Sequence, residues 1–171
     1  MSIAATGWAL VLPYLFGAAG SLLGGIVGDA LVARGMSVVR ARKVPVVGGL
    51  ILGGLFSVPT ALAPTTTLAL AAICGVQLFI NIASAGGWAM AATLADRRTT
   101  ASLGSLQNFG GYFGGAFAPL VTGLVLGATG SFVVALLIAS VVALVAAGLY
   151  AWAVRKPVPS RPGVGVREES R

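Results

Sequence analysis

The stretch GGIVGDALVARGMSVVRARK (residues 24–43) places charged residues between two long uncharged segments. Its single acid is Asp29, and its four bases are Arg34, Arg40, Arg42 and Lys43. A basic loop of this kind can hold nucleic acid, face a membrane surface or act as a gate between two helices. The sequence on either side therefore decides what the loop does.

The composition of the whole chain is that of a membrane protein. Of its 171 residues, 57% are hydrophobic and 9% are charged, whereas a soluble domain has about 25% charged residues. There is no histidine and Cys74 is the only cysteine, so we expect no disulfide within the chain, no metal site and no cofactor. The net charge of +7 comes from three separate clusters of bases, which favours membrane lipid as the partner and argues against nucleic acid.

Five uncharged stretches are each close to or above the ~20 residues that an α-helix needs to cross the hydrocarbon core of a bilayer. They cover residues 8–28, 44–62, 68–94, 105–127 and 132–154. The segments APTTT (63–67) and ATGS (128–131) predict turns between them. We therefore expect an all-α integral membrane protein with five transmembrane helices in one domain, residues 1–154. A disordered basic tail, residues 155–171, should follow.

The distribution of bases predicts the orientation of these helices. With five spans, all eleven Lys and Arg residues fall on the same side of the membrane. By the positive-inside rule this side is cytoplasmic, so the C-terminus is cytoplasmic and the N-terminus lies outside the inner (plasma) membrane. The first span lacks the basic n-region of a signal peptide. An outside N-terminus and an odd number of spans lead us to expect that an upstream part is absent from the chain.

Gly25, Asp29 and Arg34 in the basic loop resemble the cytoplasmic gate motif of the major facilitator superfamily, in the copy that joins helices eight and nine. Two longer segments, LPYLFGAAGSLLGGIVGDALVARG (12–35) and SLGSLQNFGGYFGGAFAPLVTGLVLGATGSF (102–132), resemble the anion:cation symporter branch, which carries organic anions such as sugar acids. The resemblance implies that the chain corresponds to helices eight to twelve, part of the C-terminal half of the fold. Helices one to seven would then be missing.

Polar residues inside the third span are the first candidates for a substrate site. Gln77, Asn81 and Ser84 share one face of this predicted helix. They could form the polar wall of a cavity. The alternative is that they make hydrogen bonds to a neighbouring helix, each typically contributing ~0.6–2 kcal/mol in a membrane.

The resemblance adds further candidates for substrate binding. Trp88, in the segment AGGWAM (85–90), corresponds to a tryptophan that contacts the substrate in the family. Asn108 resembles an asparagine of helix eleven that hydrogen-bonds the substrate in this branch. Tyr112, one turn beyond Asn108, is a further candidate whose alternative role is packing.

The predicted function is that of the C-terminal portion of a secondary active transporter. It would carry organic anions by proton- or sodium-coupled symport and alternating access. No span contains an ionisable acid, lysine, arginine or histidine, so the resemblance implies that the coupling carboxylates and the substrate-binding arginines belong to the N-terminal half. We expect the chain to be inactive unless an upstream segment or a complementary chain supplies the missing helices.

Two other readings remain open from the sequence. The chain could be a small membrane packing or scaffold subunit, because its glycine-rich helix faces would suit that role too. It could also be a truncated remnant without function. An enzyme is not expected, because no acid pair lies at membrane depth and no nucleophile has a base nearby.

Overall fold

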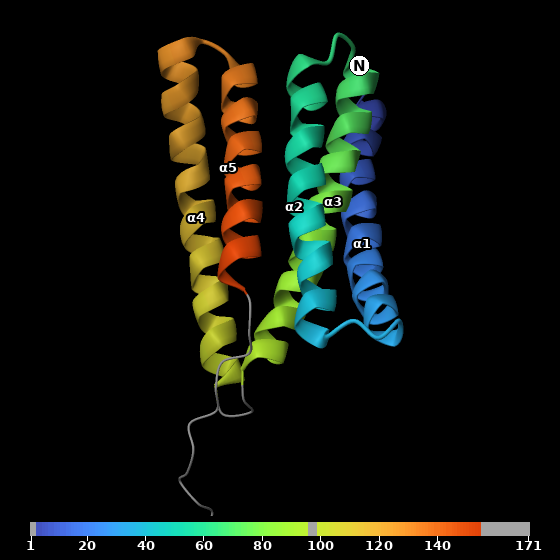
Figure 1. Cartoon of the computed structure of the whole chain (residues 1–171). Helices are drawn as coiled ribbons and strands as arrows, with labels where there is room; N and C mark the ends of the chain where they lie inside the picture. Colours follow the sequence, from blue (N-terminus) through green and yellow to red (C-terminus); the bar gives the residue numbers. More distant parts are fainter. Residues whose placement is uncertain (1–2, 96–98, 155–171) are drawn as a thin grey trace, which may run out of the picture.

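The computed structural model describes residues 3–95 and 99–154, and within these ranges all regular secondary structure is α-helical. The five helices are α1 (Ile3–Ala33), α2 (Val38–Leu62), α3 (Thr66–Leu94), α4 (Thr100–Thr129) and α5 (Phe132–Ala153) (Figure 1). Each contains an apolar stretch long enough to cross a bilayer. The predicted class, an all-α membrane protein with five spans, is confirmed. The predicted disordered tail lies outside the described residues.

Four of the five helices extend beyond the uncharged stretches that predicted them. The clearest case is α2, which begins at Val38, so that its first turns contain Arg40, Arg42 and Lys43. Arginine and lysine are good helix formers, so a lack of charge marks where a helix crosses the lipid and not where it ends. As a result Pro45 lies inside α2 and not in its first turn.

Two glycines with left-handed backbone end helices at the predicted breaks. Gly35 (φ 87°) follows α1, and the Met36 N–H donates to the Leu31 carbonyl at 3.1 Å, which closes the last turn. Gly130 (φ 66°) ends α4 with a bond from its own N–H to the Leu126 carbonyl at 2.8 Å. The hydroxyl of the next residue, Ser131, accepts from the first turn of α5. The short turn predicted at 128–131 is therefore present, and it forces α5 to run back along α4.

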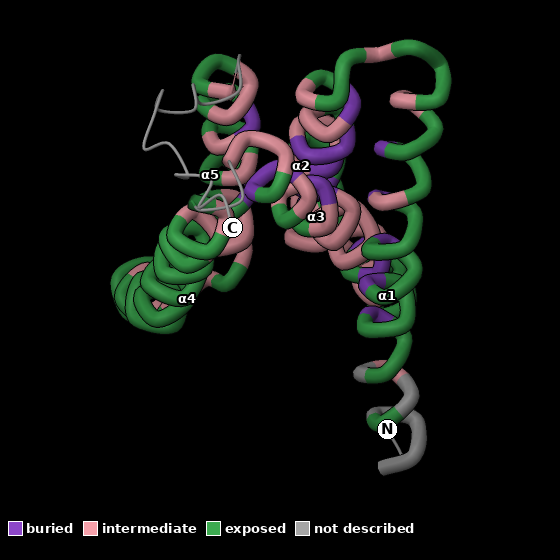
Figure 2. The backbone as a smooth tube through the Cα atoms, turned by 90° about the horizontal axis from the view of Figure 1, so that it is seen from below, coloured by how far each residue is buried: buried purple, intermediate pink, exposed green. Residues whose placement is uncertain are grey.

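The tightly packed part of the structure is centred on α2 and α3. Helix α3 packs against both α1 and α2, and α5 packs on another side of α2. A Cβ atom added at Gly20 of α1 would lie 2.2 Å from the Leu78 carbonyl oxygen of α3, and one at Gly49 of α2 would lie 2.4 Å from that of Phe79. Only glycine permits this approach of backbones, the usual way in which membrane helices associate. Figure 2 accordingly shows buried backbone on α1, α2 and α3 and none on α4.

Helix α4 is different, because none of its residues is buried. It touches α5 and α3 only sparsely, and Figure 1 shows it beside α5 and away from α1. Seven of its glycines would accept a Cβ atom with no described atom within 4 Å: Gly104, Gly110, Gly111, Gly114, Gly115, Gly123 and Gly127. By helical spacing, one broad face of α4 contains five of them, Gly104, Gly110, Gly111, Gly114 and Gly115, and a Cβ atom on this glycine-rich face would meet nothing in the described chain.

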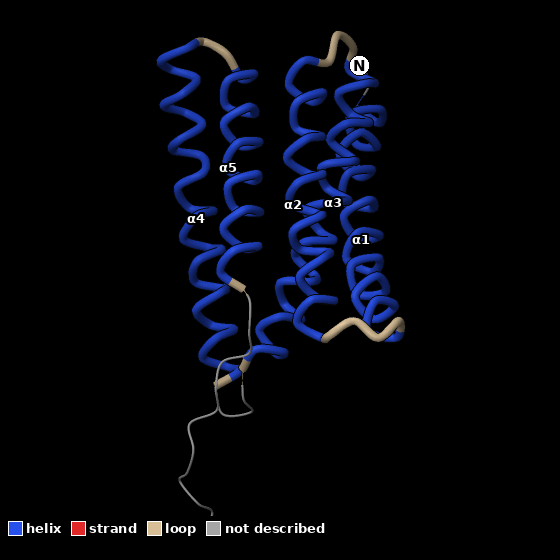
Figure 3. Tube along the Cα trace, in the orientation of Figure 1, coloured by secondary structure: helices blue, strands red, loops and turns tan. Residues whose placement is uncertain are grey.

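Successive helices run in opposite directions, and short loops join them (Figure 3). The N-terminal end of α1, the α2–α3 loop and the α4–α5 turn lie at one end of the bundle (Figure 1). The α1–α2 loop and the C-terminal ends of α3 and α5 lie at the other. The four bases of residues 34–43 are gathered at this second end. The remaining bases of the chain lie outside the described residues.

Candidate functional site

A groove with a volume of about 320 Å³ runs between α3 and α4. Its lining residues are Ser84 and Trp88 of α3 together with Gln107, Asn108, Gly111 and Tyr112 of α4. Four of the six substrate-site residues predicted from the sequence thus lie together. Gln107 is an addition, and it directly precedes Asn108 in an uncharged span, where a second amide is itself unusual.

Helical spacing and two glycines explain why these side chains meet. Ser84 and Trp88 are one turn apart on α3, as are Asn108 and Tyr112 on α4, so each pair lies on one helix face. Between α3 and α4, a Cβ atom added at Gly87 would lie 3.5 Å from the Gln107 amide nitrogen. Its neighbour Gly86 instead lies against α2. The two glycines of AGGWAM therefore let α3 fit between α2 and α4 at this level.

The lining of the groove is polar but uncharged. It offers two amides, two hydroxyls and one indole N–H, and none of these groups makes a hydrogen bond within the described part of the chain. Trp88 is 51% exposed and Tyr112 is 75% exposed, so the groove is open. Neutral donors and acceptors beside flat aromatic rings suit a hydroxylated ligand. The described ranges contain no cluster of three or more His, Cys, Asp or Glu side chains that could hold a metal ion.

Asn81 and Gln77 do not line this groove. The Asn81 amide donates to the Gln77 backbone carbonyl at 2.8 Å, and its Oδ1 atom lies 3.5 Å from the Ser21 hydroxyl of α1. A Cβ atom added at Gly17 would lie 3.0 Å from the same amide. Asn81 is therefore packed between α3 and α1. Trp88 lies two turns further along α3, and there the helix beside this face of α3 is α4 and not α1.

The acid of the predicted gate motif has a partner that the motif does not contain. Asp29 forms an ion pair with Arg42 of α2, with a distance of 2.7 Å between carboxylate and guanidinium. A Cβ atom added at Gly28 would lie 2.7 Å from the same guanidinium, so glycine makes room for it. Arg34 is exposed and forms no ion pair within the described residues, and Gly25 faces open space. The ion pair between α1 and α2 is thus Asp29–Arg42. The sequence contains a signal for it, because the two residues have opposite charges and lie on either side of a short connection between two helices.

Lys43, the residue after Arg42, connects α2 to α5. Its ammonium group donates to the backbone carbonyls of Ala151 and Val154, the latter at 2.9 Å. These carbonyls belong to the C-terminal end of α5, where a cation is favoured by the helix dipole and satisfies acceptors that lack a partner within the helix. Sequence reasoning missed this contact because the residues are more than a hundred positions apart.

Comparison with known proteins gives a consistent set of relatives, although no family model matches the chain. It is 36% identical over 161 residues to a probable L-galactonate transporter of Escherichia coli, which covers 92% of the chain and 35% of the relative. It is 33% identical over 132 residues to a probable galactarate/D-glucarate transporter of Bacillus subtilis, an alignment that covers 77% of the chain and 29% of the relative. It is 32% identical over 144 residues to a D-galactonate transporter of Escherichia coli, an alignment that covers 84% of the chain and 33% of the relative. The chain thus spans about a third of the length of these relatives.

Proposed function

We propose that this chain, which is homologous to part of the sugar-acid transporters of the major facilitator superfamily, forms the C-terminal portion of a secondary active transporter for organic anions such as sugar acids. The observation that carries the proposal is the groove between α3 and α4. It gathers neutral hydrogen-bonding groups at membrane depth in a chain whose relatives are named as sugar-acid transporters.

The chemistry of the groove indicates which part of a sugar acid it would contact. Amides and hydroxyls exchange hydrogen bonds with sugar hydroxyls, and the Trp88 indole can lie against the apolar face of the carbon chain. A carboxylate would need a base. The bases among the described residues lie at the end of the bundle and not in the groove. We therefore assign the hydroxyl-bearing arm of the substrate to this chain. The carboxylate and the coupling proton or sodium ion would be bound by N-terminal helices.

The open face of α4 is a suitable packing surface for those N-terminal helices. An apolar helix without a buried residue and with a glycine-rich face is suited to close contact with other helices. We propose that N-terminal helices cover this face of α4 and close the groove. Rocking of the two parts would then expose the groove to each side of the membrane in turn. In this proposal the chain does not transport by itself.

The end of the bundle that carries the bases is proposed to be cytoplasmic, in the inner membrane, by the positive-inside rule. Arg34, Arg40, Arg42 and Lys43 all lie at that end. The proposed cytoplasmic gate then consists of the α1–α2 connection with its Asp29–Arg42 ion pair. Breaking and re-forming an exposed ion pair costs little, which suits a contact that changes during transport.

The test is sugar-acid uptake by a complete transporter, in which this chain is joined to the N-terminal helices of one of its relatives and reconstituted in proteoliposomes. Asn108→Ala and Trp88→Phe should each reduce uptake of labelled galactonate at least tenfold, since both residues line the groove. Asn81→Ala is the matched control, because Asn81 packs against α1. It should lower thermal stability without raising the KM. Full uptake by a folded Asn108→Ala variant would refute the assignment of the groove.

The open face of α4 also suits a scaffold subunit that holds another membrane protein. The same two substitutions separate the functions. Capture of a partner through the face of α4 should tolerate Asn108→Ala and Trp88→Phe, because neither changes a glycine of that face. A chain that retains a partner and never supports uptake when completed would favour the scaffold.

A further inference from the structure

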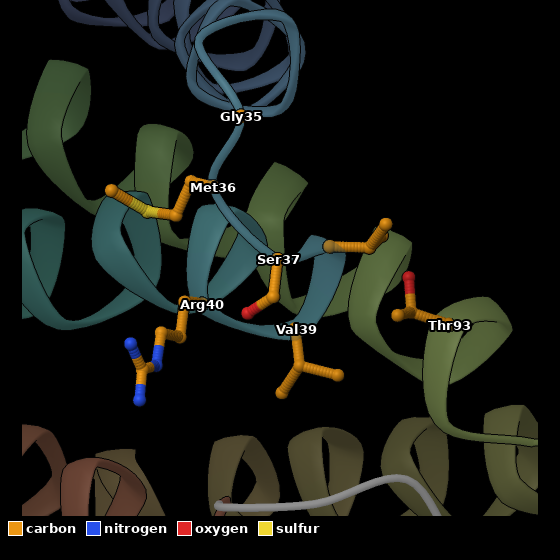
Figure 4. A pocket seen from close by; sticks show the side chains of 7 residues that line it. Gly35, Met36, Ser37, Val39, Arg40 and Thr93 are labelled. Atoms are coloured by element: carbon orange, nitrogen blue, oxygen red, sulfur yellow. The ribbon is translucent and has the colours of Figure 1, made fainter.

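A second, larger groove with a volume of about 740 Å³ lies where the α1–α2 loop meets the end of α3. It is lined by Gly35, Met36, Ser37, Val38, Val39, Arg40 and Thr93. Figure 4 shows Val39 and Arg40 extending from the first turn of α2 on the same side, with Thr93 of α3 across from Val39. This groove is separate from the one between α3 and α4, and it adjoins the α1–α2 connection of the proposed gate without including its Asp29–Arg42 ion pair.

The position of the groove fixes its surroundings. It lies at the ends of α1 and α2, each of which is long and apolar enough to cross a bilayer. The ends of such helices lie at the level of the lipid headgroups. If α1 and α2 cross a bilayer, the groove lies near the level of the headgroups, and acyl chains lie further along the helices.

Within the described residues, no acid balances the charge of the groove. Arg40 lines it and the nearby Arg34 precedes the loop, and both side chains are exposed. Asp29 is the one acid among the described residues, and it is already paired with Arg42 at 2.7 Å. Neither Arg34 nor Arg40 forms an ion pair or a side-chain hydrogen bond within the described ranges. Two exposed guanidinium groups therefore have no anionic partner within the described ranges.

We propose that this groove binds the headgroup of an anionic phospholipid. The Arg40 guanidinium can bind a phosphate through two parallel hydrogen bonds. The Ser37 hydroxyl makes no capping bond to α2 and can donate to a further phosphate oxygen. Met36, Val38 and Val39 give the groove an apolar wall, which suits the glycerol and the first methylenes of a lipid and not a fully hydrated anion.

The expected strength follows from the number of bases. An arginine near an anionic membrane surface typically strengthens binding about fivefold. Arg40→Gln should therefore weaken retention of the lipid about fivefold, and Arg34→Gln with Arg40→Gln about 25-fold. Because both groups are exposed, the difference between anionic and zwitterionic lipid should shrink as salt is raised.

The experiment measures lipid retained by the full chain in detergent, by native mass spectrometry, after mixing with phosphatidylglycerol or phosphatidylcholine. Arg161→Gln is the charge-matched control, since it removes one positive charge and changes none of the seven residues that line the groove. Melting temperatures check that each variant is folded. We expect preference for phosphatidylglycerol in the unaltered chain and in Arg161→Gln, a loss in Arg40→Gln, and no displacement of the lipid by inorganic phosphate.

Three outcomes would overturn the proposal. Equal retention of the two lipids by the unaltered chain would show that the groove does not select an anion. Equal weakening by Arg161→Gln and Arg40→Gln would show that only net charge matters. Displacement by inorganic phosphate would assign the groove to a soluble anion. None of these results bears on sugar-acid uptake, so this inference and the proposed function are tested independently.

Discussion

Arg42 and Asp29 join α2 to α1 through an ion pair of 2.7 Å, at the same end of the bundle at which the next residue, Lys43, joins α2 to α5. The two contacts differ in kind. The Asp29 side chain is 71% exposed and the Arg42 side chain 21%, so water competes for the ion pair. Lys43 is half-buried and donates to backbone carbonyls at a helix end, which lack a partner within the helix. The first contact is therefore easily broken, and the second is a fixed part of the fold.

A double-mutant cycle should measure the first contact. We expect a coupling free energy of about 0.2–1 kcal/mol between Asp29→Asn and Arg42→Gln, because exposed pairs are screened by solvent. The measurement is reversible unfolding of the chain in mixed detergent micelles. The control cycle pairs Asp29→Asn with Arg34→Gln and should give no coupling, because Arg34 does not contact Asp29 in the structure. Equal coupling in both cycles would mean that Asp29 responds to general positive charge.

Lys43→Met should destabilise the chain more than any single change to the ion pair. The charged hydrogen bonds to Ala151 and Val154 should contribute about 1–3 kcal/mol to the free energy of unfolding. Methionine keeps most of the apolar stem and removes the charge. Hydrogen exchange should accelerate in the last turn of α5, where the Val154 N–H donates to the Tyr150 carbonyl. Lys43→Arg should retain most of the protection, and unchanged exchange in Lys43→Met would refute the capping role.

The sequence was sufficient to predict the five spans and their breaks, because the absence of charge over a helix-length segment has one explanation in a membrane protein. It could not predict which helix covers which turn of α3. Asn81 and Trp88 lie on nearly the same stripe of α3, yet Asn81 packs against α1 and Trp88 lines the groove with α4. Periodicity identifies the stripe, whereas the packing of the neighbours decides the role of each residue on it.

Contacts between distant residues were the other part that sequence reasoning missed. Arg42 was one of four bases in a short segment, and only the path of the chain shows that it, and not Arg34, reaches Asp29. Gln107 was passed over beside Asn108, although both amides line the groove. In each case the sequence shows the residue type, but the partner that its side chain reaches depends on how two helices pack.

Gln107 gives a sharper test of the proposed substrate contact than the residues taken from the resemblance. In the completed transporter, Gln107→Leu should raise the KM for galactonate about two- to tenfold, the effect of losing one neutral hydrogen bond. Gln77→Leu is the matched control, since Gln77 does not line the groove, and it should leave the KM unchanged. Uptake kinetics in proteoliposomes measure both. A larger effect from Gln77→Leu would indicate that the substrate binds on the side of α3 that faces α1.

Two glycine substitutions should separate the packed helices from the open one. Gly20→Ala should destabilise the isolated chain by about 1–3 kcal/mol, because its Cβ atom would lie 2.2 Å from the Leu78 carbonyl oxygen and must push α1 away from α3. Gly114→Ala should be neutral or stabilising by up to ~1 kcal/mol, because its Cβ atom would meet no described atom and alanine favours the helix. Unfolding in detergent measures both changes.

The same pair of substitutions, made in the completed transporter, tests what covers α4. If N-terminal helices pack on its glycine-rich face, the effect of Gly114→Ala on stability changes sign. The substitution then destabilises the complex, because the added methyl group must displace a neighbouring helix. Gly20→Ala should be destabilising in both settings, since its neighbour Leu78 belongs to this chain. If Gly114→Ala is equally harmless in both, this face of α4 is turned to lipid. The N-terminal helices would then have to reach the groove from the side of Ser84 and Trp88, where α3 forms its wall.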